Sequence, residues 1–222
     1  MVRVSAPPRP DLEFERLLRA QGWGRVAGVD EVGRGSWAGP LVAAAVVLPF
    51  DNAKCTDALK DVCDSKQLDA TTRESLFGLI VEHAASIGIG WSSHHEIDGA
   101  GLGKANRRAL LRAVLHLHPS ADAVVIDHFK LPECLLPQIS VTKGDCRSLS
   151  VAAASIVAKV VRDRWMVAVD RRIPGYRFAF HKGYGTPSHR VALTALGPSP
   201  IHRMSFRPLE RLNEDWQGPC DE

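Results

Sequence analysis

Hydrophobic and polar positions at the start of the chain follow a strand-like pattern. Two apolar runs, at 25–30 and 41–48, predict neighbouring strands. The first runs into a glycine-broken turn at 33–35, and Pro49 ends the second. Because the connection between them is short, we expect the two strands to pair as a hairpin.

Further along the chain, strand-like and helix-like periods alternate. The predicted helices are 71–86, 102–118 and 148–172, and the predicted strands are 87–92 and 123–127. Thr71 or Thr72 is the expected N-cap of the first helix. A hairpin followed by alternating helices and strands predicts an α/β fold, in which a mixed sheet is flanked by helices.

The predicted helix 102–118 separates a basic stripe from an apolar one. The basic stripe is Lys104, Arg108 and Arg112, and the apolar stripe is Leu110, Val114 and Leu117. We therefore expect one side of this helix to face the core and the other to face solvent or phosphate. A second basic region lies at 159–190.

Composition indicates an ordinary globular chain. It has 222 residues, of which 45% are hydrophobic and 24% charged, and a net charge of +3. We expect a flexible arm at 1–10, a folded body at 11–174, and a helical segment and tail at 175–222 packed on that body. No apolar run approaches the roughly 18 residues that a membrane span needs.

The expected compartment is the cytoplasm. The proline-rich segment 1–10 has no apolar stretch of the kind found in secretory signals. Five cysteines are an odd number and form no C-x-x-C pair, so we interpret them as free thiols.

Carboxylates follow two of the predicted strands. Asp30 and Glu31 come at the end of the first strand, and Asp127 ends the strand at 123–127. Adjacent residues of a strand point to opposite faces, although a turn beginning at Asp30 can bring both acids to one ion. Acids at the ends of separate strands suit a hard cation such as Mg²⁺ or Mn²⁺.

A fourth acid would complete a site for two metal ions. The candidates are Asp145, in a loop after a glycine, and Asp163, in the long helix between two arginines. A loop can bring its backbone to a site, whereas Asp163 fits a structural ion pair on a basic helix. We prefer Asp145, although spacing alone leaves the choice open.

Seven sequence blocks in one order resemble the type 2 ribonucleases H, specifically bacterial ribonuclease HII. They extend from about Ala27 to Pro208. The blocks are DEVGRG at 30–35 with AGP at 38–40, DSKQL at 64–68, VID at 125–127, KGD at 143–145, AAASIVAKV at 152–160 with RD at 162–163, HKGYGT at 181–186 and HRMSF at 202–206.

The resemblance implies a ribonuclease H-like core and a set of active-site residues. The implied catalytic and metal-binding acids are Asp30, Glu31, Asp127 and Asp145. The implied contacts to the ribose 2′-OH, sugar and phosphate are Gly33, Arg34, Gly35, Tyr184, Lys66 and Lys182. The cofactor would be Mn²⁺ or Mg²⁺, and the basic stripe and the region around 159–182 would neutralise the nucleic-acid backbone.

The implied activity is hydrolysis of the RNA strand of RNA–DNA hybrids and cleavage 5′ of ribonucleotides embedded in DNA. Such an enzyme serves ribonucleotide excision and primer removal, and the family suggests a monomer that contacts no membrane. Two alternatives stay open at this point: a hybrid-binding module without catalysis, and a metal-dependent DNA nuclease on the same core.

Three positions depart from the common pattern of the family. Ser36 and Trp37 stand where Pro-Leu is frequent, and His128 follows Asp127 where glycine is usual. His128 is interpreted as a solvated neighbour or as a modulator of metal-bound water. None of the three is an implied acid, so they bear on specificity and metal preference.

Overall fold

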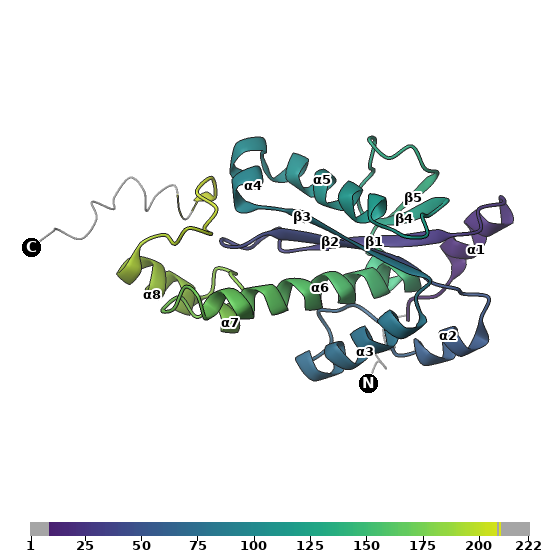
Figure 1. Cartoon of the computed structure of the whole chain (residues 1–222), viewed down its shortest axis with the longest axis horizontal. Coiled ribbons are helices and arrows are strands. Elements are labelled where there is room, and N and C mark those ends of the chain that lie inside the picture. Colours follow the sequence, from purple (N-terminus) through teal and green to yellow (C-terminus); the bar gives the residue numbers. More distant parts are fainter. Residues whose placement is uncertain (1–8, 208, 210–222) are drawn as a thin grey trace, which may run out of the picture.

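A five-stranded mixed sheet forms the centre of the computed structural model, which describes residues 9–207 and 209 (Figure 1). The strand order is β3-β2-β1-β4-β5. Their bounds are β1 (Val26–Val32), β2 (Leu41–Val47), β3 (Ser86–Ser92), β4 (Ala123–Asp127) and β5 (Gln138–Val141). The pairs β1–β2 and β2–β3 are antiparallel, and β1–β4 and β4–β5 are parallel. The predicted hairpin and the mixed sheet are confirmed.

Helices cover both faces of the sheet. Figure 1 shows α4 and α5 on one face, and the long α6, with α2 and α3 below it, on the other. The bounds are α1 (Glu13–Ala20), α2 (Ala53–Ala58), α3 (Ala70–His83), α4 (His94–Ala100), α5 (Leu102–Leu115), α6 (Leu149–Asp170), α7 (Phe178–His181) and α8 (Pro187–Leu196), with a 3-10 turn η1 at Gly144–Cys146. The fold is therefore α/β, as predicted.

Strand β1 is buried on both faces. Val26 belongs to the apolar cluster on the α6 side, whereas Ala27 and Val29 belong to the cluster on the α5 side. A Cβ at Gly28 would lie 2.0 Å from the carbonyl carbon of Ser150, at the start of α6. Glycine therefore permits the close approach of α6 to β1, two residues before Asp30.

Several predicted boundaries are wrong by a few residues. Helix α3 begins at Ala70, because the cap is Asp69, whose Oδ1 accepts a hydrogen bond from the Thr72 N–H at 2.7 Å. It ends at His83, since Ser86 already pairs in β3. Strand β1 continues through Val32 instead of ending at 30.

Five elements were not predicted: α1, α2, α4, β5 and η1. Each has eight residues or fewer, so the chain carries too few periods there for a pattern to stand out. Helix α4 did have a local signal, because Ser93 and Glu96 form a capping box.

The C-terminal segment packs against the far end of α6. Met166 of α6 shares an apolar cluster with Tyr176, Phe178 and Leu193. In Figure 1, α7 and α8 lie beside that end of α6. The segment is helical here as predicted, while the proposed domain boundaries at 10 and 174 stay predictions. The arm at 1–8 and the tail at 208 and 210–222 lie outside the described residues.

Among the described residues, Cys55, Cys63, Cys134 and Cys146 are free thiols, as predicted, and Cys220 lies outside the described part. Within the same part of the chain, none of the helices has the length and apolar character needed to cross a membrane.

Candidate metal and nucleic-acid site

The parallel pairing of β1 and β4 brings the first and third acids together. Val29 is registered with Ile126, so Asp30 and Asp127 are the next residues on adjacent strands. Asp30 is 5% exposed, and its Oδ1 accepts a hydrogen bond from the Glu31 N–H at 2.7 Å. The two strand-end acids therefore share one edge of the sheet.

A backbone hydrogen bond ties the Asp145 loop to this edge. The Gly144 N–H donates to Asp127 Oδ1 at 2.7 Å, and Lys143 reaches the turn through a left-handed conformation with φ of 56°. Asp145 follows at once in η1 and is buried. The structure therefore brings Asp145 close to the strand-end acids, and its role as the fourth acid stays a prediction.

Asp163, the other candidate, is occupied by cations. It accepts a hydrogen bond from Lys159 Nζ at 2.9 Å, and Arg73 lies 3.9 Å away. These contacts support its interpretation as a structural ion-pair residue.

Burial and mutual repulsion make ionisation of the acids difficult in the absence of a cation. Burial raises the pKa of Asp30 well above its usual value, and the charges of Glu31 and Asp127 raise it further. Burial also raises the pKa of Glu31 to about 7, although Arg34 opposes the change. The pKa of Asp127 is raised by burial as well. A divalent cation would remove this penalty, because it favours the ionised form of every ligand.

Asp30 and Glu31 reach the site from opposite faces of the sheet. The hydroxyl of Ser155, on α6, lowers the pKa of Asp30, whereas the side chain of Asn106, on α5, lowers that of Glu31. This differs from the expectation of a turn beginning at Asp30, since β1 continues past both residues.

The oxygens of Glu31 fit a cation. Arg34 Nη1 lies 3.6 Å from Oε1, but Oε2 is buried and has no hydrogen-bond partner among the described residues. A buried carboxylate oxygen without a donor is costly. Together with the all-oxygen donor set, it is what a site for Mg²⁺ or Mn²⁺ provides.

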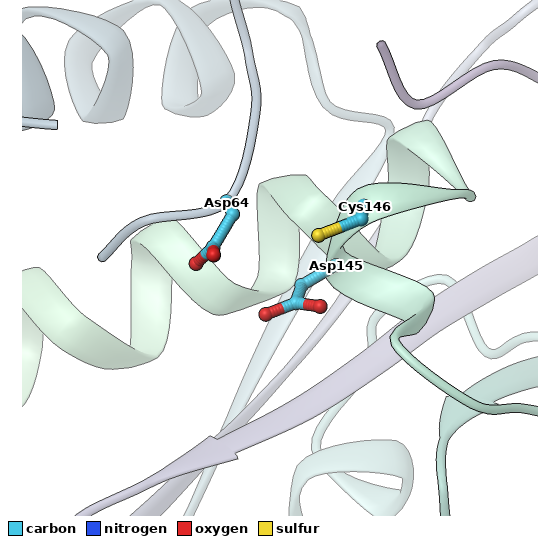
Figure 2. A group of neighbouring side chains, drawn as sticks. All are labelled: Asp64, Asp145 and Cys146. Carbon is cyan, nitrogen blue, oxygen red and sulfur yellow. The ribbon is translucent and has the colours of Figure 1, made fainter. Parts of the chain in front are cut away.

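A second group of polar atoms adjoins Asp145. One ligand-type atom each from Asp64, Asp145 and Cys146 lies within 4.8 Å of the others. Figure 2 shows Asp64 entering from the loop before α3 and facing the side chains of Asp145 and Cys146 beside α6. Asp64 was not singled out as a site residue, although it lies in one of the matched blocks.

Lys66 contacts two acids of this group, Asp145 and Asp64. Its Nζ donates to Asp145 Oδ2 at 3.0 Å and lies 3.9 Å from Asp64. Burial lowers the pKa of Lys66, but the hydrogen bond and charge of Asp145 and the charge of Asp64 outweigh it, so the pKa is raised. Lys66 therefore carries its charge beside the acids.

Two buried arginines hold the Gly-Arg-Gly turn from beneath. Arg162 donates to Ser36 Oγ at 2.8 Å, and Arg203 donates to the carbonyl of Arg34 at 3.1 Å. Both side chains are fully buried. We expected the basic region around 159–182 to neutralise a nucleic-acid backbone, but for Arg162 this is wrong, because its guanidinium binds carbonyls of the protein interior.

The turn lies directly beside Tyr184. Ser36 and Tyr184 form an antiparallel bridge, and the Trp37 N–H donates to the Gly183 carbonyl at 2.8 Å. Arg162 lies 5.5 Å from the centre of the Tyr184 ring. The two elements expected to contact the sugars, separated by about 150 residues of chain, are thus neighbours in space.

Three further basic residues, Arg112, Lys182 and His128, differ in the contacts that they make. Arg112 is bonded to Glu96 at 2.8 Å, so the basic stripe of α5 is in part a structural pair. Lys182 Nζ donates to the carbonyl of Ala179, and burial lowers its pKa. His128 follows the third acid with φ of 57°, and its charge lowers the pKa of Asp127. The sequence signalled neither the pair of Arg112 nor the local bond of Lys182.

Comparison with known proteins gives one consistent result. The family model described as ribonuclease HII matches residues 27–208. The chain is 50% identical over 200 residues to ribonuclease HII of Chloroflexus aurantiacus, covering 90% of this chain and 94% of that one. It is 48% identical to ribonuclease HII of Geobacillus thermodenitrificans, covering 89% and 74%. The fold is similar to the crystal structure of ribonuclease H2 from Pyrococcus horikoshii, with a TM-score of 0.72, 26% identity and coverage of 86% and 98%.

Proposed function

Because the chain belongs to the ribonuclease HII family and is a ribonuclease H, we propose that it cuts DNA duplexes 5′ of embedded ribonucleotides as well as RNA–DNA hybrids. The observation that carries this proposal is the position of the Gly-Arg-Gly turn. It joins the strand that carries Asp30 and Glu31 to the loop that carries Tyr184. One short segment therefore links the acids to the elements expected to contact the sugar.

In this proposal Asp30, Glu31, Asp127 and Asp145 hold divalent cations, Mn²⁺ or Mg²⁺. Their oxygens come from two adjacent strands and the η1 turn, and the donor set suits these ions. The chemistry that such ions supply is activation of the attacking water and stabilisation of the departing 3′ oxygen. The acids themselves bind and orient, and the products carry a 5′-phosphate and a 3′-hydroxyl.

Gly33, Arg34 and Gly35 would identify the ribose. The 2′-OH both donates and accepts hydrogen bonds, and it distinguishes RNA from DNA at a single position. Gly33 has φ of 93°, which lets the turn present backbone groups at its surface. Tyr184, on the neighbouring segment, would pack on the adjacent deoxyribose.

Two lysines would contact phosphate in different ways. Lys66 is 75% exposed along its side chain while bonded to Asp145, so it can exchange this partner for a phosphate oxygen. Lys182 would first have to leave the Ala179 carbonyl. We expect the stronger contribution from Lys66. The proposed partner is nucleic acid. The protein itself is proposed to be a monomer in the cytoplasm.

The experiment is cleavage of a DNA duplex that contains one ribonucleotide. Wild type and Asp30→Asn are compared with Mn²⁺, with Mg²⁺ and with EDTA, beside an all-DNA duplex of the same sequence. We expect metal-dependent cutting on the 5′ side of the ribonucleotide, lost in Asp30→Asn. Cutting of the all-DNA duplex would contradict the sugar-reading role of the turn, and full activity of Asp30→Asn would contradict the assignment of the acids.

A further inference from the structure

Trp37 contacts the loop that carries Tyr184 on both sides of that tyrosine. Its N–H donates to the Gly183 carbonyl at 2.8 Å, directly before Tyr184. Directly after Tyr184, its indole lies against Gly185, where an added Cβ would be 2.2 Å from Trp37 Cζ2. Ser36, the residue before Trp37, pairs with Tyr184 itself in an antiparallel bridge. The course of the loop therefore follows the segment that contains Trp37.

The two glycines of this loop permit the close approach. Gly183 has φ of 81°, and a Cβ there would lie 2.5 Å from the Ala38 carbonyl oxygen. At Gly185 the six-membered ring of the indole takes the space that a side chain would need. A larger residue at either position would push the loop away from Trp37.

Helix α8 holds the indole from another direction. The centre of the Trp37 ring lies 5.5 Å from that of His189, whose Nδ1 faces the Tyr184 carbonyl at 3.0 Å. The Arg190 guanidinium lies 5.4 Å from the centre of the indole, within the range of a cation–π contact. Because both residues belong to α8, the indole is packed between that helix and the loop.

These contacts act on the position of Tyr184. They reach the backbone and the glycines on either side of it, so they limit the directions in which its side chain can point. A binding residue is held accurately when the residues behind it are themselves fixed by packing, and Trp37 is fixed in this way.

We propose that Trp37 is a positioning residue for Tyr184, through which it determines the preference for a deoxyribose next to the cleaved ribonucleotide. The inference rests on the proposed packing of Tyr184 on that deoxyribose. A displacement of about 1 Å at a positioning group can lower a rate on the order of 100-fold. Leucine, which is frequent at position 37 in the family, has no ring to fill the space beside Gly185, so the loop would be free to shift.

The test compares two substrates of the same base sequence. One is a DNA duplex with a single ribonucleotide, and the other is an RNA–DNA hybrid whose cut strand is all RNA. Only the first has a deoxyribose next to the cleaved ribonucleotide. The measured quantity is the ratio of kcat/KM for the single ribonucleotide to kcat/KM for the hybrid, because a general loss of structure lowers both values alike.

We expect Trp37→Leu to lower this ratio by about 10-fold. Trp37→Phe keeps an aromatic ring beside Gly185 and should retain part of the preference. A wild-type ratio in Trp37→Leu would overturn the proposal. If Trp37→Leu fails to fold, Gly185→Ala disturbs the same contact from the side of the loop, and a wild-type ratio in Gly185→Ala would then overturn it.

Trp165→Leu is the matched control. Trp165 packs against the same apolar cluster as Trp37, but its ring lies beside Gly39. We expect Trp165→Leu to lower the thermal midpoint and to leave the ratio unchanged. An equal fall of the ratio in both variants would show a general effect of the cluster and would overturn the positioning role.

A double variant separates this inference from the proposed function. If Trp37 acts through Tyr184, Trp37→Leu should not lower the ratio further in a Tyr184→Ala background. A further fall in that background would overturn the inference while the role of Tyr184 stands. A wild-type ratio in Tyr184→Ala alone would instead contradict the proposed contact of Tyr184 with the deoxyribose.

Discussion

Arg162 donates a hydrogen bond to the hydroxyl of Ser36, 2.8 Å away, beneath the Gly-Arg-Gly turn. The same guanidinium donates to the carbonyls of Ala38, Pro40 and Lys182. Ser36 is one of the positions that depart from the common family pattern, and here its buried hydroxyl is one of the acceptors of the buried Arg162 guanidinium. The departure therefore has a physical role, which is to stabilise a buried charge close to the turn.

Arg162→Lys should destabilise the protein far more than Ser36→Ala. A lysine cannot serve several carbonyls in one plane, so buried acceptors lose their donors, at a cost of about 3 kcal/mol. Ser36→Ala removes one acceptor while Ala38 still accepts, and should cost about 1 kcal/mol. Urea unfolding in EDTA measures both values.

The double variant tests whether these two residues act together. Because they share one hydrogen bond, we expect its loss of stability to be smaller than the sum of the single losses. Strict additivity would show that the Ser36 hydroxyl contributes nothing through Arg162.

Gly33→Ala should disrupt the turn, and Gly35→Ala is its control. A Cβ at Gly33 would lie 2.3 Å from Arg162 Nε, at φ of 93°. At Gly35 a Cβ would meet nothing within 4 Å. We expect Gly33→Ala to lose more than about 1 kcal/mol of stability and most of its cleavage activity. Gly35→Ala should keep wild-type stability.

Cleavage by Gly35→Ala then tests the proposed approach of the ribose. If the backbone of the turn contacts the sugar, an added methyl group at Gly35 should lower cleavage at a single ribonucleotide at unchanged stability. Cleavage rates of both variants on the same duplex measure this. Wild-type cleavage by Gly35→Ala would place the sugar contact elsewhere.

The acids at strand ends could be predicted from the sequence because local apolar runs indicate where the strands lie and where they end. Asp30 and Asp127 follow apolar runs, and parallel pairing then places them side by side. The position of Asp145 could not be predicted in this way. It depends on the hydrogen bond from the Gly144 N–H to Asp127, and the spacing of these residues in the sequence does not indicate that they meet. The loop argument could only favour Asp145 over Asp163, and the family resemblance implied the same residue.

The burial of polar side chains could not be predicted from the sequence. Arg162 lies among exposed cations in the chain, and nothing local distinguishes it from Arg164, which pairs with Glu74 at the surface. Asn106 lies between Ala105 and Arg107 on a helix with a basic stripe. Their burial is decided by which side of α6 or α5 meets the sheet, so tertiary packing had to be known first.

Removing the metal should make stability fall as pH rises toward neutrality. The pKa of Glu31 is about 7 in the folded protein without a cation, against 4.5 for the ordinary group, so the folded state binds the extra proton. The associated stability is fully present below pH 4.5 and is lost as pH rises through 7, by on the order of 2 to 3 kcal/mol.

Thermal midpoints in EDTA between pH 5 and 8 test this contribution of Glu31. Glu31→Gln should flatten the decline, because an amide does not titrate. Mn²⁺ should raise the midpoint of wild type at pH 8 more than that of Glu31→Gln. The same slope in both proteins would contradict the assignment of this titration to Glu31.

Acid should unfold the C-terminal segment by protonating two histidines that contact each other in space, His189 and His202. His189 Nδ1 faces the Tyr184 carbonyl at 3.0 Å and therefore carries its proton there. Its Nε2 then accepts from His202 Nε2, 2.9 Å away, and His202 Nδ1 accepts from the Ser199 N–H at 2.8 Å. This chain requires both rings to be neutral, since one more proton would place two N–H groups face to face.

Burial lowers the pKa of His189 to about 4 and that of His202 to about 3. Because both values lie below the ordinary 6.5, the unfolded state binds more protons in acid. The contribution of the two neutral rings to stability is complete above pH 6.5 and is lost as pH falls through 4 and 3.

His202→Gln keeps a donor toward His189 without a titrating ring, so its acid-unfolding midpoint should lie at lower pH than that of wild type. Fluorescence against pH measures it, with exposed His118→Gln as the control; equal shifts in both variants would contradict the role of the buried pair. Since His189 binds the Tyr184 carbonyl, unfolding of this segment in acid should release the Tyr184 loop, and cleavage should fail with the fold.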